Sequence, residues 1–236
     1  MVNTIKRHNA EGRLTVFICP VGPVGQYSIF VRMVNRDRVS LKNCWFLNMD
    51  EYLTDEGRVG GKEPSPLLPG ALWTGRSTPR WIRRCLCPRP SACSPTPRPR
   101  NLQRVIAAVG GVDIAFGGIG INGHLAFNEA QDEAYPRRIC GFAHPCAGDQ
   151  PGNTGGKRHR RSERGHRRHA KKCVTIGMAQ ILGARKIRLG VFRDWHRSVV
   201  RQAAYGEVSA HFPATLVQRH PDALIIANAN AAQQPF

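Results

Sequence analysis

The amino-acid sequence predicts one domain of the α/β class, in which a mostly parallel sheet carries helices on both faces. Three observations lead to this prediction. Short apolar runs rich in β-branched residues alternate along the chain with stretches of helical spacing, which is typical of parallel sheets covered on both sides. Several of these runs lead directly into glycine or polar residues, as strands do before a loop. The length of 236 residues is enough for one sizeable core.

The predicted elements follow one another in a regular order. The predicted strands are short runs of apolar residues, and they span 13–19 (RLTVFIC), 43–49 (NCWFLNM), 112–116 (VDIAF), 186–192 and 223–227. The predicted helices have apolar residues at helical spacing, and they span 26–34, a helix end at 102–109, 178–182 and 197–205. Strand, loop and helix therefore alternate along most of the chain.

Two basic tracts interrupt this order. Residues 61–100 contain eight Lys or Arg against one Glu, and residues 136–172 contain eleven against two acidic residues. Only five of the first 40 residues and two of the second 37 are Leu, Ile, Val or Phe, which is too few for a core. Nine of the seventeen prolines lie between residues 64 and 99, and proline removes a backbone donor. We predict that both tracts are irregular or disordered within a single domain spanning residues 1–236.

The sequence shows no signal for secretion or for a membrane. The first residues contain no apolar run before a small-residue cleavage site, and no stretch reaches the ~18 apolar residues of a membrane span. The eight cysteines form no CxxC pair, which favours reduced thiols. We expect a cytoplasmic protein without a membrane partner.

Polar residues that can carry chemistry follow the predicted strands. In open α/β sheets, ligands bind beyond the carboxyl ends of the strands. Asp50 comes after strand 43–49, and His124 and Glu129 come in the loop after strand 112–116. One imidazole and two carboxylates near one crevice form the acid and base set that proton transfer next to a carbonyl requires. Alternatively, Asp50 caps a helix and His124 caps a loop, as single residues often do.

The loop after residue 116 also contains Gly118, Gly120 and Gly123, which match the G-x-G-x-x-G pattern of dinucleotide-binding proteins. That pattern requires the third glycine to begin a helix and an acidic residue ~20 positions later. Residues 124–129 have no helical pattern, and the position expected for the acid falls in the second basic tract. We therefore interpret Gly118 and Gly120 as positions where backbone N–H groups approach an oxygen-rich ligand.

Three stretches, in this order, resemble the glucosamine-6-phosphate deaminase and isomerase family. They are LNMDEYL (47–53), FGGIGINGHLAFNE (116–129) and VTIGMAQILGARKIRLGVF (174–192). Residues 13–27 are similar to the phosphate loop of that family, and residues 209–227 are similar to its closing helix and strand. The resemblance covers somewhat over half of the chain and implies a Rossmann-like sheet.

The resemblance implies a cofactor-free conversion of glucosamine 6-phosphate, a phosphorylated amino sugar, to fructose 6-phosphate and ammonia. Asp50 matches the base that moves a proton between C2 and C1 of the opened sugar. His124 matches the residue that opens the ring, and Glu129 matches the carboxylate that supports it. Asn122 stands where the deaminases carry an aspartate. Because an amide cannot accept a proton, we expect weaker ring opening. The oligomers of the family make a homo-oligomer a further expectation.

The phosphate side of the implied site also departs from the family. Where the family's loop offers Ser and Thr hydroxyls, Gly22 and Gly25 offer backbone N–H groups before a helix. Arg197 falls near the family's phosphate-binding lysine, with His196 adjacent, and brings a different donor geometry. We expect Gly22, Gly25 and Arg197 to contact the phosphate.

The basic tracts leave other interpretations open. Because the resemblance stops and resumes at their edges, we hypothesise that they are out-of-frame translations or sequence errors, which resequencing of the coding region would test. The chain would then be an inactive sugar-phosphate-binding relic. A nucleic-acid-binding arm around His159 competes with this hypothesis, although it lacks interleaved aromatic residues. Zinc binding by His166, His169 and Cys173 lacks a second ligand pair. Hydrolysis of a phosphorylated sugar lactone is a further alternative within the fold.

Overall fold

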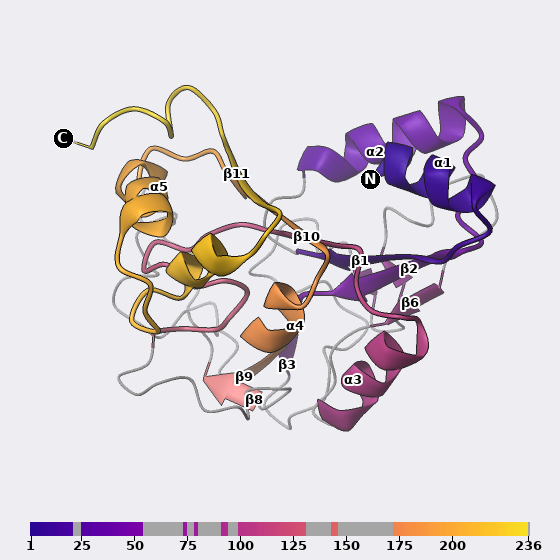
Figure 1. The fold of residues 1–236 in the computed structure, drawn as a ribbon, viewed down its shortest axis with the longest axis horizontal. Helices are drawn as coiled ribbons and strands as arrows, with labels where there is room; N and C mark the ends of the chain where they lie inside the picture. Colours follow the sequence, from indigo (N-terminus) through magenta and orange to yellow (C-terminus); the bar gives the residue numbers. More distant parts are fainter. Residues whose placement is uncertain are drawn as a thin grey trace, which may run out of the picture.

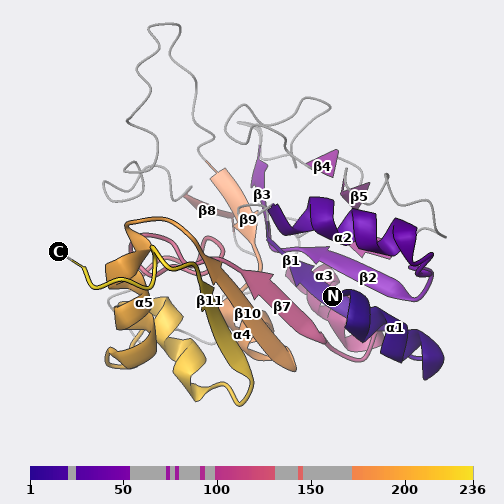
Figure 2. The same cartoon turned by 90° about the horizontal axis from the view of Figure 1, so that it is seen from above.

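A six-stranded parallel sheet forms the centre of the molecule (Figures 1 and 2). The computed structural model describes residues 1–20, 25–53, 73–74, 78–79, 91–93, 99–130, 143–145 and 172–235. Within these residues the strand order is β11-β10-β7-β1-β2-β6, and every pairing in this sheet is parallel. The strands are β1 (Thr15–Cys19), β2 (Cys44–Asn48), β6 (Ser91–Cys93), β7 (Ile114–Gly117), β10 (Lys186–Val191) and β11 (Ala223–Ala227).

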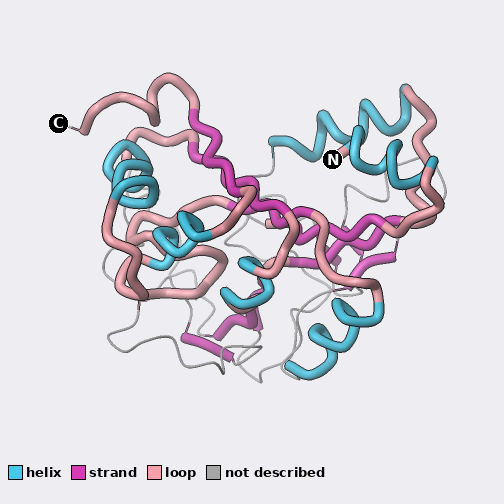
Figure 3. The backbone as a smooth tube through the Cα atoms, in the orientation of Figure 1, coloured by secondary structure: helices cyan, strands magenta, loops and turns pink. Residues whose placement is uncertain are grey.

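Helices cover both faces of this sheet, which confirms the predicted architecture (Figures 1 and 3). One face carries α1 (Val2–Ala10) and α2 (Gly25–Arg36). The other carries α3 (Pro99–Ala108), α4 (Met178–Leu182), α5 (His196–Tyr205) and the 3-10 helix η3 (Pro213–Arg219). Side chains alternate along β1 between the two cores. Val16 and Ile18 pack with α3 and α4, while Phe17 and Cys19 pack with α1 and α2.

The chain also forms elements that the sequence did not predict. Helix α1 is one of them, because only Val2, Ile5 and His8 of its nine residues are buried, and polar residues separate them. A second sheet is antiparallel and has the order β3-β9-β8. Its strands are β3 (Asp50–Leu53), β8 (Ala143–Pro145) and β9 (Lys172–Thr175). Asp50 therefore begins a strand, where a position after a strand was predicted.

Most of the two basic tracts lies outside the described residues. The described pieces of the first tract are β4 (Trp73–Thr74), which pairs with β5 (Thr78–Pro79), the edge strand β6, and the start of α3. Those of the second are β8 and the first residue of β9. Irregular structure over the rest of both tracts stays a prediction, and so does the nucleic-acid-binding arm around His159.

One half of the sheet face that carries α1 and α2 stays open within the described structure. Leu224 and Ile226 on β11, and Phe192 directly after β10, are about half exposed there. A groove of about 490 Å³ runs over this half, with Arg7 on α1 and Phe116 on β7 in its lining. Its walls combine apolar side chains with cationic ones.

Three thiols of the described residues are free and buried, those of Cys19, Cys44 and Cys173. Burial raises the pKa of Cys19 and of Cys44 to about 12, so both stay protonated near neutral pH. None of the described helices combines the length and the apolar composition that crossing a bilayer requires.

Candidate active site

The segments that carry Asp50 and His124 leave the main sheet at the carboxyl ends of its strands. Strands β2 and β7 flank β1, and all three are parallel, so their carboxyl ends meet at one edge. Asp50 follows β2 after one residue, and the loop 118–129 follows β7. Because adjacent strands lie ~4.8 Å apart, the two segments leave the sheet about 10 Å from each other. The topology therefore places Asp50 and the loop at one edge; a cavity shared by them stays a prediction.

Three side chains of the 118–129 loop contact one another in a triangle. Nδ1 of His124 lies 2.5 Å from Oδ1 of Asn122 and 3.3 Å from Oε1 of Glu129. The amide Nδ2 of Asn122 donates to Oε2 of Glu129. Both neighbours of Nδ1 are acceptors, so we assign the proton of the neutral ring to Nδ1. Nε2 is then the ring nitrogen that can exchange a proton with a ligand.

Asn122 has a geometric role in this triangle. Its carbonyl oxygen accepts from His124, and its amide nitrogen donates to Glu129, so one side chain orients both partners. The amide cannot supply the negative charge of an aspartate. The amide thus keeps the orienting role of this position, while Glu129 is the carboxylate beside His124 that can stabilise an imidazolium.

Two glycines of the loop leave space for rings. A Cβ atom at Gly120 would overlap the imidazole of His124, and one at Gly123 would overlap the ring of Phe212. Gly123 also has a φ of +82°, which glycine adopts readily. Neither glycine begins a helix, in agreement with the rejection of a dinucleotide-binding motif. Gly120 therefore seats the imidazole, and the predicted contacts of Gly118 and Gly120 with a ligand stay predictions.

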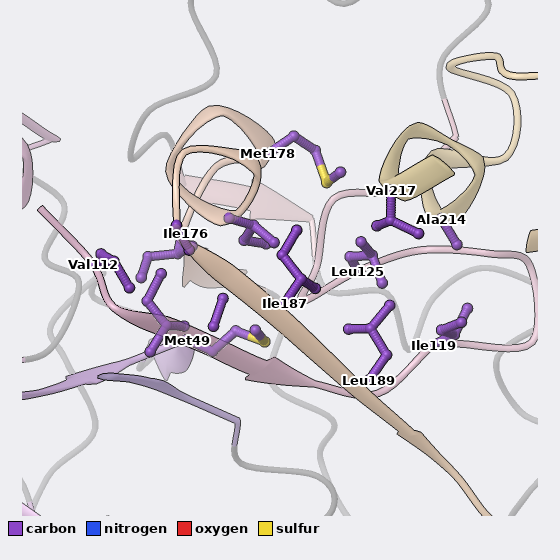
Figure 4. Packing of buried hydrophobic residues seen from close by; sticks show 14 of the residues in the cluster. Met49, Val112, Ile119, Leu125, Ile176, Met178, Ile187, Leu189, Ala214 and Val217 are labelled. Carbon is purple, nitrogen blue, oxygen red and sulfur yellow. The ribbon is translucent and has the colours of Figure 1, made fainter. Parts of the chain in front are cut away.

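Apolar side chains anchor the loop in the larger core. Figure 4 shows Ile119 and Leu125 of the loop beside Leu189 of β10 and near Ala214 and Val217 of η3, and all five side chains are buried. The loop that carries the polar triangle is thus held in place by buried apolar side chains. Preorganised acid and base groups require such support.

His196 connects this loop to the segment after β10, a role that the sequence did not reveal. It is 6% exposed, its Nδ1 accepts from the backbone N–H of Arg193 at 2.9 Å, and its Nε2 lies 3.1 Å from the carbonyl oxygen of Ile119. Because Nδ1 is an acceptor, Nε2 carries the proton and donates it to Ile119. Burial lowers the pKa of His196, which favours this neutral form.

Asp50 is 8% exposed and lies in the second sheet, in register with Thr175 of β9. The hydroxyl Oγ1 of Thr175 accepts from the backbone N–H of Phe127 at 3.1 Å. The residue that pairs with Asp50 therefore also binds the loop that carries His124. Thr175 is a second residue that the sequence reasoning missed, because its contacts join segments 48 residues apart.

The predicted phosphate side is described in part. Gly22 lies outside the described residues, and Gly25 opens α2 and is exposed. Tyr27 of α2 donates its hydroxyl proton to the carbonyl oxygen of Pro20 at 2.6 Å. Burial raises the pKa of Tyr27 well above its ordinary value, with smaller contributions from nearby groups that include Asp50. Tyr27 therefore remains a hydrogen-bond donor.

Arg197 lies at the first turn of α5, beyond the carboxyl end of β10. Its Nε donates to the carbonyl oxygen of Asn230 at 3.1 Å, and its Nη2 donates to Oδ1 of Asn230 at 2.5 Å. Asn230 in turn donates to Asp194. These bonds hold the guanidinium toward the C-terminal segment, and its predicted contact with phosphate stays a prediction.

Within residues 1–20, 25–50, 102–130 and 173–235, no three His, Cys, Asp or Glu side chains cluster in the way a metal ion requires. His166 and His169 of the zinc interpretation lie outside the described residues. The groove on the open sheet face is not lined by Asp50 or by the triangle of His124. The carboxyl edge, where acids and an imidazole gather, is therefore the candidate active site.

Comparison with curated proteins finds glucosamine-6-phosphate deaminases. The protein from Thermoanaerobacter pseudethanolicus is 26% identical over 234 residues, which cover 97% of this chain and 87% of that protein. The protein from Lachnoclostridium phytofermentans is 25% identical over 213 residues, which cover 86% and 82%. No family model matches the chain.

Solved structures share the fold. A monomeric glucosamine-6-phosphate deaminase of the NagB superfamily superposes with a TM-score of 0.73 at 20% identity, covering 98% of this chain and 92% of that one. The 6-phosphogluconolactonase from Trypanosoma cruzi gives a TM-score of 0.61 at 13% identity, covering 98% and 88%. These relatives and neighbours confirm the resemblance that the sequence motifs predicted.

Proposed function

We propose that this chain, a relative of the glucosamine-6-phosphate deaminases, converts glucosamine 6-phosphate and water to fructose 6-phosphate and ammonia. The observation that carries the proposal is the triangle of Asn122, His124 and Glu129 at the sheet edge that also receives Asp50. An aldose-to-ketose conversion needs two separate proton transfers, one at the ring oxygen and one between neighbouring carbons. The triangle of His124 is suited to the first of these proton transfers, and Asp50 is suited to the second.

His124 is suited to the first transfer. Its Nδ1–H is held by acceptors on Asn122 and Glu129, so Nε2 can give a proton to a ring oxygen and take one from the C1 hydroxyl. When the ring is charged, the carboxylate of Glu129 at 3.3 Å stabilises the imidazolium. Ring opening at this site produces the open-chain aldehyde.

Asp50 is suited to the second transfer. A carboxylate can take the proton from C2 of the open-chain aldehyde and return it to C1, which leaves an imine at C2. Water then adds to the imine carbon and ammonia leaves, so that the C2 ketone of fructose 6-phosphate forms. Asp50 is largely buried, which keeps bulk water away from the base.

Ammonia release from glucosamine 6-phosphate by the purified chain tests the proposal. We expect turnover that Asp50→Asn reduces by at least ~100-fold, because the amide cannot accept the C2 proton. The substrate should also raise the melting temperature of both proteins, since a ligand that binds only the native state stabilises it. Substrate-induced stabilisation without any turnover would favour the inactive sugar-phosphate-binding relic instead.

Two further assays address the other interpretations. Hydrolysis of 6-phosphogluconolactone without ammonia release would favour the lactone alternative. Retention on a polyanion that decreases with salt, in a chain that shows no sugar-phosphate binding, would favour a nucleic-acid-binding protein.

A further inference from the structure

Asn128 holds the end of the loop that carries His124. Its side chain is 3% exposed, and its Nδ2 donates to two carbonyl oxygens, those of Leu125 and Ile176, each at 2.8 Å. The first bond closes a turn within the loop, and the second joins the loop to the segment after β9. Asn128 directly precedes Glu129 of the triangle.

Ile176, which accepts from Asn128, also binds the residue that precedes Asp50. Its backbone N–H donates to the carbonyl oxygen of Met49 at 2.7 Å, while its own carbonyl oxygen accepts from Asn128. Met49 directly precedes Asp50. One residue of the chain therefore binds the immediate neighbours of both Asp50 and Glu129.

A second bond runs beside the first. Thr175 is 2% exposed and pairs with Asp50 in the β3–β9 ladder, and its Oγ1 accepts from the N–H of Phe127. Ala126 lies between Leu125, whose carbonyl oxygen accepts from Asn128, and Phe127, whose N–H donates to Thr175. Its φ of +57° is the left-handed conformation that a residue with a side chain avoids. Such strain of about 1–3 kcal/mol persists only where neighbouring contacts hold the backbone. Thr175 and Asn128 provide such contacts.

We propose that Asn128 and Thr175 are positioning residues that set the separation between Asp50 and the His124–Glu129 pair. This inference rests on the proposed function, because the separation matters only if both groups act on one sugar. A displacement of ~1 Å between reacting groups can cost about 100-fold in rate. Neither residue needs to touch the substrate.

The chain offers a matched pair of variants. Thr175→Val removes the hydroxyl that accepts from Phe127 and keeps the shape of the side chain, whereas Thr175→Ser keeps the hydroxyl. In the full-length protein, we expect Thr175→Val to lower kcat for ammonia release at least ~10-fold with KM within about threefold. Thr175→Ser should retain most of the wild-type kcat. A merely structural role would lower the melting temperature and would leave the kcat of the folded fraction unchanged.

Asn128→Asp provides a second, nearly isosteric test. The carboxylate would face two carbonyl oxygens without a donor, so both hydrogen bonds of Asn128 are lost. We expect backbone amides 123–129 to exchange with solvent deuterium at least ~10-fold faster than in the wild type, while amides of β1 and β10 exchange at wild-type rates. This readout does not require the protein to be an enzyme.

The outcomes separate the two proposals. Wild-type ammonia release together with wild-type kcat in Thr175→Val would overturn the positioning role and leave the proposed function standing. Absence of ammonia release from the wild type would overturn the proposed function and the positioning role that rests on it. Unchanged amide exchange at 123–129 in Asn128→Asp would overturn the positioning role whatever the activity.

Discussion

The burial of His196 makes the stability of this protein depend on pH. The buried ring is neutral, with Nδ1 accepting from Arg193 and Nε2 donating to Ile119. Burial lowers the pKa of His196 below its ordinary value of 6.5, although the bond to the Ile119 carbonyl acts in the opposite direction. Between the lowered pKa and 6.5, the unfolded chain binds a proton that the native ring does not. The contribution of His196 is therefore present above pH 6.5 and is lost as the pH falls toward the lower, native pKa.

The size of this effect follows from the same linkage. Each pH unit over which only the unfolded chain is protonated costs about 1.4 kcal/mol of unfolding free energy. Acidification from pH 7.5 to 5.5 includes at most one such unit, between pH 6.5 and 5.5, so the loss from His196 has an upper bound of about 1.4 kcal/mol. In a protein of this size, this corresponds to roughly 3–5 °C in melting temperature.

His196→Gln removes the titration and keeps an acceptor and a donor on one planar group. Urea unfolding at pH 7.5 and 5.5 should show a smaller loss of stability on acidification in His196→Gln than in the wild type. His211→Gln makes the same change at an exposed position and should leave the wild-type loss intact. If His196→Gln and the wild type lose the same free energy on acidification, the ring does not act as described.

Substitutions at three further positions test other parts of the structure. Asp113 is buried, accepts from a buried N–H of β1 at 2.8 Å and binds two arginines. In urea unfolding, we expect Asp113→Ala to lower the free energy of unfolding by about 2–3 kcal/mol. Asp113→Asn keeps an acceptor and should lower it by about 1 kcal/mol. Asn122→Asp restores the missing charge beside Glu129 and should raise kcat/KM for ammonia release about tenfold; a lower kcat/KM would show that orientation matters more than charge. Gly120→Ala should abolish turnover by displacing the ring of His124, with a folded circular dichroism spectrum as the control.

The order of strands and the place of the site could be predicted from the sequence because both depend on local pattern. The run at β1 and the alternation along β10 are visible in single segments, and polar residues at strand ends mark the ligand edge of an open sheet. Asp50, His124 and Glu129 were therefore chosen as candidates from the sequence, and their role as a site stays a prediction. His124 and Glu129 form a triangle with Asn122 in the structure, and no spacing rule contains this amide bridge.

The remaining features depend on contacts between distant segments. Helix α1 buries only three side chains against the sheet, and its pattern is too sparse to identify alone. The segment that contains Thr175 forms strand β9 by pairing with β3, which lies more than 100 residues earlier in the chain. The inward orientation of His196 toward Ile119 follows from two backbone contacts that the sequence around it does not encode. From the sequence, we expected the neighbouring Arg197 to contact the phosphate, and in the structure its side chain binds Asn230.

The second sheet relates the basic tracts to the candidate site. Leu53, the last described residue before the first basic tract, is the register partner of Lys172, at which the second tract ends. Three residues along the same ladder, Asp50 pairs with Thr175. Backbone hydrogen bonds between the two strands fix this register. Asp50 and Thr175 therefore stand at the end of the ladder away from Leu53 and Lys172, and Thr175 joins the ladder to the loop of His124 through the N–H of Phe127.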